Sequence, residues 1–163
     1  MISFDAGSHR FNLRAAAVIV QRGYVLLHQV DGDDFWSLPG GRVEPGEPAA
    51  HTVVREMQEE VGASVRVGNM LCIAENFYTH DGRQHHEIGV YFPAELAAGS
   101  PLLDLTTAHR GAEADKRLTF AWFALDRLSE IDVQPAFLRE LLTRDRHVLA
   151  HVVQQDEHYE IAY

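Results

Sequence analysis

The chain of 163 residues contains a single cysteine, Cys72, and lacks any long hydrophobic run. One cysteine excludes an intrachain disulfide framework and a cysteine-rich zinc site. The longest purely aliphatic run, residues 15–20, is much shorter than the roughly 20 residues that span a bilayer. The N-terminus also lacks the basic start and apolar core of a secretory signal. We therefore expect no membrane association and a reducing, cytoplasmic location.

Basic residues are also scarce, because 14 Lys and Arg stand against 24 Asp and Glu and give a net charge of −10. This balance disfavours non-specific binding to nucleic acid, which depends on basic side chains at the phosphates. A small phosphorylated ligand remains compatible if arginines, a helix N-terminus or a divalent cation hold it. The sequence has no P-loop, dinucleotide-binding turn or serine-hydrolase elbow, which disfavours those three chemistries.

The length predicts one domain over residues 1–163, large enough to bury its own core. The turn at Gly23 predicts a hairpin of the strands on either side, and Asp81-Gly82 predicts another, with a bulge near Gly89. Two helices are expected, at 48–61 and from Pro135 to about Thr143. The expected strands span residues 12–20, 24–30, 64–79, 84–96, 119–125 and 147–153. Strands interrupted by two helices predict a mixed α/β or α+β domain.

The helix at 48–61 carries two distinct faces when it is projected at 100° per residue. Its apolar stripe is predicted to face the core and consists of Ala50, Val53, Val54, Met57 and Val61. Glu56, Glu59 and Glu60 form a separate acidic patch with i, i+3, i+4 spacing. Such like charges destabilise a helix by about 0.2–0.5 kcal/mol per pair, and a divalent cation reverses that sign. An acidic triplet alone is most often a solvated helix face.

The triplet stands inside a longer pattern with fixed spacing. The residues that carry it are Trp36, Leu38-Pro39-Gly40-Gly41, Glu47, Arg55-Glu56-Met57, Glu59-Glu60 and Gly62-Ala63. The pattern resembles the Nudix box, G-x5-E-x7-R-E-U-x-E-E-x-G-U, in which U is a bulky aliphatic residue. Ala63 is smaller than usual, which weakens a packing contact and leaves the carboxylates intact. The resemblance covers roughly residues 12–128 and does not account for a C-terminal helix and tail at 135–163.

The resemblance implies a Nudix fold, in which a mixed β-sheet lies between helices in an α/β/α sandwich. It implies that Glu56, Glu59 and Glu60 bind Mg²⁺ or Mn²⁺, with the carbonyl of Gly40 as a further ligand. Glu47 and Arg55 would form an ion pair that holds the loop against the helix. Gly41 and Gly62 would serve the loops at either end of the box.

The reaction implied by the resemblance is hydrolysis of a diphosphate linkage in a nucleoside diphosphate joined to another group. Divalent cations would neutralise the phosphates and lower the pKa of the attacking water. The resemblance makes Glu56, Glu59 and Arg55 the catalytic candidates, with Arg55 positioning the carboxylates. The general base is Glu56 or Glu59, with Glu113 on the 98–117 loop as the alternative. Trp36 is a candidate for contact with the substrate, and the alternative is that it has a packing role only.

Other functions stay open at this point. They are a catalytically silent Nudix-like module that binds a nucleotide as a sensor, an isoprenoid diphosphate isomerase, and an RNA-end decapping hydrolase, which the negative charge disfavours. The substrate is a small-molecule nucleotide of undetermined class: a nucleoside triphosphate, ADP-ribose, a nucleotide sugar or a dinucleoside polyphosphate. A homodimer is common among relatives, and segment 135–163 is a candidate for its interface.

Overall fold

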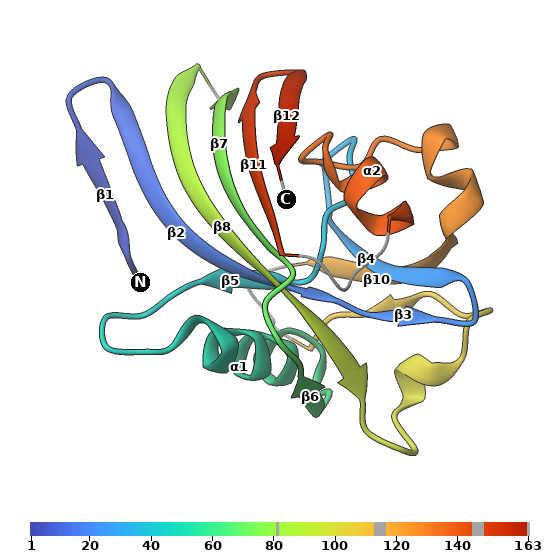
Figure 1. Ribbon diagram of the computed structural model, residues 1–163. Coiled ribbons are helices and arrows are strands. Elements are labelled where there is room, and N and C mark those ends of the chain that lie inside the picture. The colour runs from blue at the N-terminus through green and yellow to red at the C-terminus, as the bar shows by residue number, and fades with distance from the viewer. Residues whose placement is uncertain (81, 113–116, 145–148, 163) are drawn as a thin grey trace.

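The computed structural model describes residues 1–80, 82–112, 117–144 and 149–162, and its strands form two sheets (Figure 1). The larger sheet runs in the order β1 (Ser3–Ala6), β2 (His9–Val18), β8 (Arg83–Leu96), β7 (Cys72–His80), β11 (Ala150–Gln155) and β12 (His158–Ala162). Two short strands join it, β5 (Gly40–Arg42) on β2 and β6 (Val65–Val67) on β8. The smaller sheet has the order β3 (Val20–Gln21), β4 (Tyr24–Val30), β10 (Leu118–Ala124) and β9 (His109–Arg110).

The larger sheet is mixed, because β2 pairs with β8 and β7 with β11 in parallel while the other pairs are antiparallel. The helices are α1 (Ala49–Val61) and α2 (Leu138–Thr143), with 3₁₀ turns η1 (Pro101–Leu103) and η2 (Leu125–Glu130). Figure 1 shows α1 beneath the larger sheet, where it contacts β2, β5 and β6. A mixed sheet with helices on either side is the arrangement expected from the sequence.

The core lies on both faces of β2, because successive side chains of a strand point to opposite sides. Ala15 and Ala17 pack with Met57 of α1. Ala16 and Val18 pack on the opposite face with the apolar side chains of α2. Strand β2 is therefore an apolar strand buried on both sides, which explains why residues 15–20 show no polar alternation.

The predicted hairpin around Gly23 is confirmed only near its turn. Val20 pairs with Val25 and Gln21 with Tyr24, and Arg22 and Gly23 both have positive φ, as a two-residue hairpin turn requires. Residues 12–18 do not continue this hairpin, because they belong to β2 in the larger sheet. An apolar run that is buried on both faces fits between two neighbouring strands better than at a hairpin edge.

The second predicted hairpin joins β7 to β8, from the pair His80 and Arg83 inward. Asp81, in its turn, lies outside the described residues. The bulge expected near Gly89 is wrong, because the register continues without interruption through the pair Ala74 and Gly89. The strand expected at 64–79 is also split, into β6 and β7.

Helix α1 begins and ends where the sequence predicts. It ends at Gly62 in the left-handed conformation, where the Gly62 N–H donates to the Gln58 carbonyl and the Ala63 N–H to the Met57 carbonyl. The predicted apolar stripe is wrong at Val54, which is 41% exposed. The face that packs inward comprises Thr52, Val53, Glu56, Met57 and Glu60. The helix is therefore rotated so that two carboxylates of the acidic patch are buried.

The C-terminal segment contributes to both the sheet and the core. The single strand expected at 147–153 is β11, and β12 follows it in an antiparallel hairpin. Helix α2 begins at Leu138, three residues after Pro135. Phe137 and Leu138 are fully buried against Tyr91 and its neighbours. In the part of the chain that the structure describes, no helix is long and apolar enough to cross a membrane.

Candidate active site

The loop before α1 is held to the helix by a dense set of contacts around Glu47. Its carboxylate accepts hydrogen bonds from Arg55 Nε (2.9 Å) and Nη2 (3.1 Å), from Thr52 Oγ1 (2.7 Å) and from the Glu44 N–H (3.1 Å). These contacts, chiefly those from Arg55, lower the pKa of Glu47 to about 2. The same contacts raise the pKa of Arg55. The ion pair implied by the sequence pattern is thus present and keeps both groups charged.

Arg55 also brings two carboxylates of the acidic patch together. Its Nη1 atom donates to Glu56 Oε1 (2.8 Å) and to Glu59 Oε2 (3.0 Å), and its Nη2 atom donates to the Arg42 carbonyl (3.1 Å). Glu56 is only 6% exposed, whereas the Glu59 side chain is 47% exposed. The helical projection puts Arg55 beside the acidic patch, and its long side chain carries the guanidinium into the patch. These contacts suit a residue that positions carboxylates.

The glycine that begins the box, Gly41, is required by close packing. The Glu56 carboxyl lies directly over Gly41, where a Cβ atom would stand 2.2 Å from Glu56 Oε1. Any side chain at this position would push the carboxylate away. The carbonyl oxygen of Gly40 accepts a hydrogen bond from Arg14 Nη2 (3.3 Å), as does that of Leu38 (2.9 Å).

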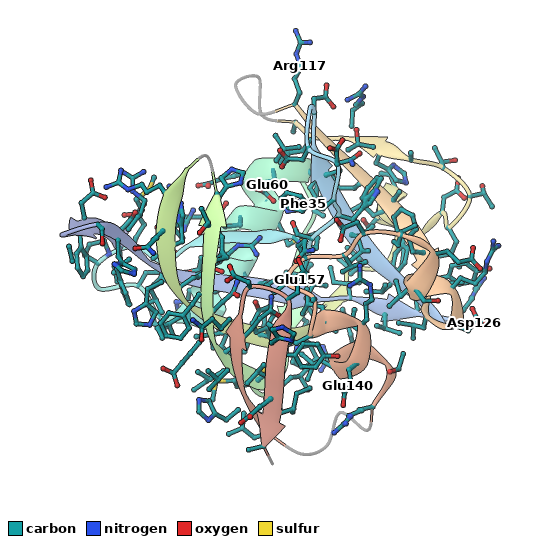
Figure 2. The ribbon with its side chains drawn as sticks, turned by 90° about the horizontal axis from the view of Figure 1, so that it is seen from above. Phe35, Glu60, Arg117, Asp126, Glu140 and Glu157 are labelled. Carbon is teal, nitrogen blue, oxygen red and sulfur yellow. The ribbon has the colours of Figure 1, made fainter. Side chains whose placement is uncertain are left out.

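Glu60 occupies a different environment from Glu56 and Glu59. Its side chain is 3% exposed, and its Oε2 atom lies 3.5 Å from Nδ1 of the buried His28 on β4. Figure 2 shows Glu60 on α1 in the view from above. The Glu60 backbone carbonyl accepts a hydrogen bond from the Ala112 N–H (2.6 Å). His28 was not found by the sequence reasoning, because a lone histidine in an apolar strand carries no signal of its partner.

The donor chemistry of this acidic face fits a divalent cation. Mg²⁺ and Mn²⁺ take carboxylate and carbonyl oxygens, and the oxygens of Glu56 and Glu59 already converge on one positively charged atom, Arg55 Nη1. Among the described residues, however, no three side chains of His, Cys, Asp or Glu are gathered into a metal-binding group. Glu60, the third carboxylate of the patch, has a contact with His28 in addition. The convergence of the Glu56 and Glu59 oxygens is the observation that supports a divalent cation at this patch.

The remaining sequence candidates lie apart from these carboxylates or outside the description. Trp36 is half-buried, and its ring packs edge-on against that of Phe123, with centroids 4.7 Å apart. Its backbone N–H donates to the Asp132 carbonyl. These contacts are those of a packed side chain. Glu113, the alternative general base, lies outside the described residues.

One polar feature was not anticipated from the sequence. Four strands of the larger sheet place an amide or carboxyl side chain at the same level of one face: Asn12, Glu87, Asn76 and Gln154. All four are buried, and burial raises the pKa of Glu87. The four positions are far apart in the chain, so only the strand register reveals that they meet. We call this set the polar row.

Known proteins resemble this chain over most of its length. A rat (Rattus norvegicus) asymmetrical bis(5'-nucleosyl)-tetraphosphatase is 28% identical over 123 residues, which cover 72% of this chain and 76% of that protein. The Bacillus subtilis (strain 168) protein YjhB is 26% identical over 101 residues, 61% of this chain but only 49% of YjhB. A MutT NUDIX hydrolase structure from Burkholderia pseudomallei superposes with a TM-score of 0.64 at 25% identity and covers 82% of this chain and 98% of that one.

A single family model matches both the fold and the box. The family model described as the NUDIX domain matches residues 10–145, a range that contains α1, α2, the Glu47–Arg55 ion pair and the three box carboxylates. That range is most of the chain, and the structural neighbour named above has the same fold. The chain therefore belongs to the NUDIX domain family.

Proposed function

We propose that this chain is a divalent-metal-dependent hydrolase that cleaves the diphosphate linkage in a nucleoside diphosphate joined to another group. Members of its family act as pyrophosphohydrolases: the rat relative is a bis(5'-nucleosyl)-tetraphosphatase, and an Escherichia coli (strain K12) relative, 40% identical over 57 residues, is a CTP pyrophosphohydrolase. That second match covers 32% of this chain and 42% of the relative. The observation that carries the proposal is the convergence of Glu56 and Glu59 on Arg55 Nη1.

In this proposal Glu56, Glu59, Glu60 and the Gly40 carbonyl would hold Mg²⁺ or Mn²⁺. A cation bound there supplies charge neutralisation at the phosphates and a lowered pKa for the attacking water. Such a cation would also explain how a protein with a net charge of −10 binds a polyanionic nucleotide.

The protein's own groups have distinct tasks in this reaction. Arg55 positions Glu56 and Glu59, and Glu47 fixes Arg55 through two hydrogen bonds. Gly41 leaves room for the Glu56 carboxylate. We assign the general base to Glu56 or Glu59, with Glu113 as the alternative, and keep Trp36 as a candidate substrate contact.

The test is a product-release screen with four substrate classes: nucleoside triphosphates, ADP-ribose, nucleotide sugars and dinucleoside polyphosphates. Each is assayed with Mg²⁺, with Mn²⁺ and with EDTA. We expect turnover of at least one class with metal and none with EDTA. Glu56→Gln should lower kcat by about 100-fold or more, because several kcal/mol of transition-state stabilisation depend on the metal site.

Glu95→Gln is the matched control for this substitution, because the Glu95 side chain is 72% exposed and pairs with Arg66 at the surface. It should leave kcat unchanged. If no class is turned over in either metal, the proposal fails and the alternative, a catalytically silent nucleotide-binding sensor, is favoured. Melting temperatures with each nucleotide would then identify the ligand of the sensor.

The remaining proposals concern location and assembly. We propose a cytoplasmic protein that acts on a small molecule and forms a homodimer through segment 135–163. In this segment Val153, on β11, is 40% exposed, and β12 is the edge strand of the larger sheet. Sedimentation velocity at micromolar concentration tests the dimer, and a monomer there would reject it.

A further inference from the structure

The polar row crosses four adjacent strands of the larger sheet, on the face that carries Tyr91, Cys72 and α2. Asn12 of β2 is in register with Glu87 of β8, Glu87 with Asn76 of β7, and Asn76 with Gln154 of β11. These strands run side by side in Figure 1. No member is more than 8% exposed. Buried polar groups in proteins are nearly always hydrogen-bonded, so a member of this row without a partner is unusual.

The two ends of the polar row have partners within the protein. Asn12 Oδ1 accepts a hydrogen bond from Ser3 Oγ (2.7 Å). Gln154 Oε1 accepts one from the Phe137 N–H (3.1 Å), and Gln154 Nε2 donates to the Asp156 carbonyl (2.8 Å). The end residues therefore have structural roles, because they connect β1 and α2 to the sheet.

The middle of the polar row is different. Asn76 Oδ1 is buried and has no hydrogen-bond partner among the described residues. The Glu87 carboxyl forms no hydrogen bond or ion pair in that same part of the chain, and its pKa is raised by burial, with Arg14 and Arg42 opposing the shift through their charge alone. The Tyr91 hydroxyl, on the same face of β8, likewise has no hydrogen-bond partner within residues 1–80, 82–112, 117–144 and 149–162. Its ring lies over Gly89, the residue between Glu87 and Tyr91 on this face.

These three groups lie beside the loop that leads into the box. Arg14 stands on the same face of β2 as Asn12, in register with Gly89, and donates hydrogen bonds to the carbonyls of Leu38 and Gly40. On the side toward the β7–β8 turn, the rings of Tyr78 and His85 stack with centroids 4.8 Å apart. Both rings are half-buried. The unpartnered groups thus lie between a partly accessible aromatic pair and the start of the catalytic box.

We propose that Asn76, Glu87 and Tyr91 form the subsite that binds the nucleobase of the substrate and selects bases that carry an exocyclic amino group. In this subsite an amino N–H donates to Asn76 Oδ1, which accepts no hydrogen bond from the described residues. The Glu87 carboxyl and the Tyr91 hydroxyl supply the donor and acceptor for the neighbouring ring nitrogen. This inference rests on the proposed function for its ligand class, since it places the base end of a nucleotide whose diphosphate lies at the box.

The test measures binding without hydrolysis, so that it stands apart from the test of the proposed function. Calorimetric titrations in EDTA compare AMP and GMP with IMP, and CMP with UMP. IMP lacks the 2-amino group of GMP, and in IMP and UMP a carbonyl and a ring N–H replace the amino group and the ring nitrogen acceptor of AMP and CMP. We expect at least one amino-bearing nucleotide to bind about tenfold more tightly than its counterpart, the effect of one satisfied hydrogen bond in a buried site. Asn76→Ala and Glu87→Gln should each reduce this preference to about twofold or less.

Glu75→Gln is the matched control, because Glu75 neighbours Asn76 on β7, points to the other face and pairs with His151. It should keep the preference. Tyr91→Phe removes only the hydroxyl and serves as a second variant if Asn76→Ala fails to fold, which its melting temperature will reveal. Equal binding of the paired nucleotides, tighter binding of IMP or UMP, or an unchanged preference in Glu87→Gln and Tyr91→Phe would overturn the inference, whether or not the protein hydrolyses any substrate.

Discussion

The acidic face of α1 and the polar row both contain buried carboxyl groups, but they differ in the hydrogen-bond donors that surround these groups. At the acidic face, Arg55 donates to Glu47, Glu56 and Glu59, so three carboxylates share one guanidinium. In the polar row, Glu87 and Asn76 lie next to each other, and none of the described residues donates to the Glu87 carboxyl or to Asn76 Oδ1. The first site is held together by its own charges, whereas the second has capacity for hydrogen bonds that the described part of the chain does not use.

This contrast has a chemical consequence. A carboxylate paired with arginine keeps its charge and its position, which suits oxygens that are to meet a cation. A buried amide or carboxyl without a partner destabilises the folded protein by about 1–3 kcal/mol, and a ligand that supplies the missing hydrogen bond recovers that energy. If both proposals hold, the acidic patch positions the reacting groups and the polar row selects the ligand.

After the loss of the Glu56 carboxylate itself, the largest effect is expected at Gly41, because the position of that carboxylate depends on the absence of a side chain there. Gly41→Ala places a Cβ atom 2.2 Å from the carboxyl carbon of Glu56, so this carboxylate must leave its place against Arg55. We expect kcat to fall by roughly 10- to 100-fold, the usual cost of disturbing a group that orients a metal ligand. Steady-state kinetics in saturating Mg²⁺ measures the loss, and a wild-type kcat would contradict the role given to Gly41.

The sequence predicted the acidic face because that site is local. The spacing of Glu56, Glu59 and Glu60 on one helix, with Glu47 and Arg55 nearby, is fixed by helical geometry and one short loop. It predicted the inward side of α1 correctly at Val53 and Met57, and it placed Val54 in the core wrongly. A helical projection gives the angles between side chains, but it does not give the direction in which the protein interior lies. That direction depends on contacts such as the one between Glu60 and His28.

The polar row could not be predicted, because its members meet only through strand register. The parallel pairing of β7 with β11 sets Asn76 beside Gln154, and no turn or motif connects those two strands. The sequence suggested one strand at 147–153, yet its alternation alone does not name a neighbour. Long-range pairing of this kind is decided by the packing of the whole sheet.

The next prediction compares the loss of stability when a partnered member of the polar row, Gln154, and an unpartnered one, Asn76, are replaced. Gln154→Leu leaves the Phe137 N–H and the Asp156 carbonyl without their partners, and we expect the free energy of unfolding to fall by about 1–3 kcal/mol. Asn76→Leu removes an amide whose oxygen has no partner among the described residues, and this substitution should cost less. Urea unfolding of both variants measures the difference. An equal loss in both would remove the distinction between the ends and the middle of the row.

Acid should weaken the acidic face through Glu47. Its pKa is about 2 in the folded protein and 4.5 as the ordinary value, so its contribution is complete above pH 4.5 and is lost as the pH falls toward 2. We expect the free energy of unfolding to decrease more steeply across that window in the wild type than in Glu47→Gln. Urea titrations at successive pH values give both slopes, and parallel slopes would show that Arg55 does not stabilise the ionised Glu47.

Glu87 should show the opposite dependence on pH. Burial raises its pKa above the ordinary 4.5, so the folded protein keeps a proton that the unfolded chain releases. Stability is therefore highest below pH 4.5 and declines as the pH rises through that shifted range. We expect Glu87→Gln, which cannot ionise, to gain stability relative to the wild type on going from acidic to neutral pH. A constant difference would show that Glu87 is already ionised like an exposed carboxyl.

The smallest effect is expected on the outer side of α1. Val54 is 41% exposed and Val53 is fully buried, although both belong to the apolar stripe predicted from the sequence. Val54→Thr should change the free energy of unfolding by no more than about 0.5 kcal/mol. The same substitution at Val53 buries a hydroxyl and should cost about 1–3 kcal/mol. If the two variants lose stability equally in urea, Val54 faces the core, and the inward orientation of Glu56 and Glu60, on which the description of the acidic face depends, is wrong.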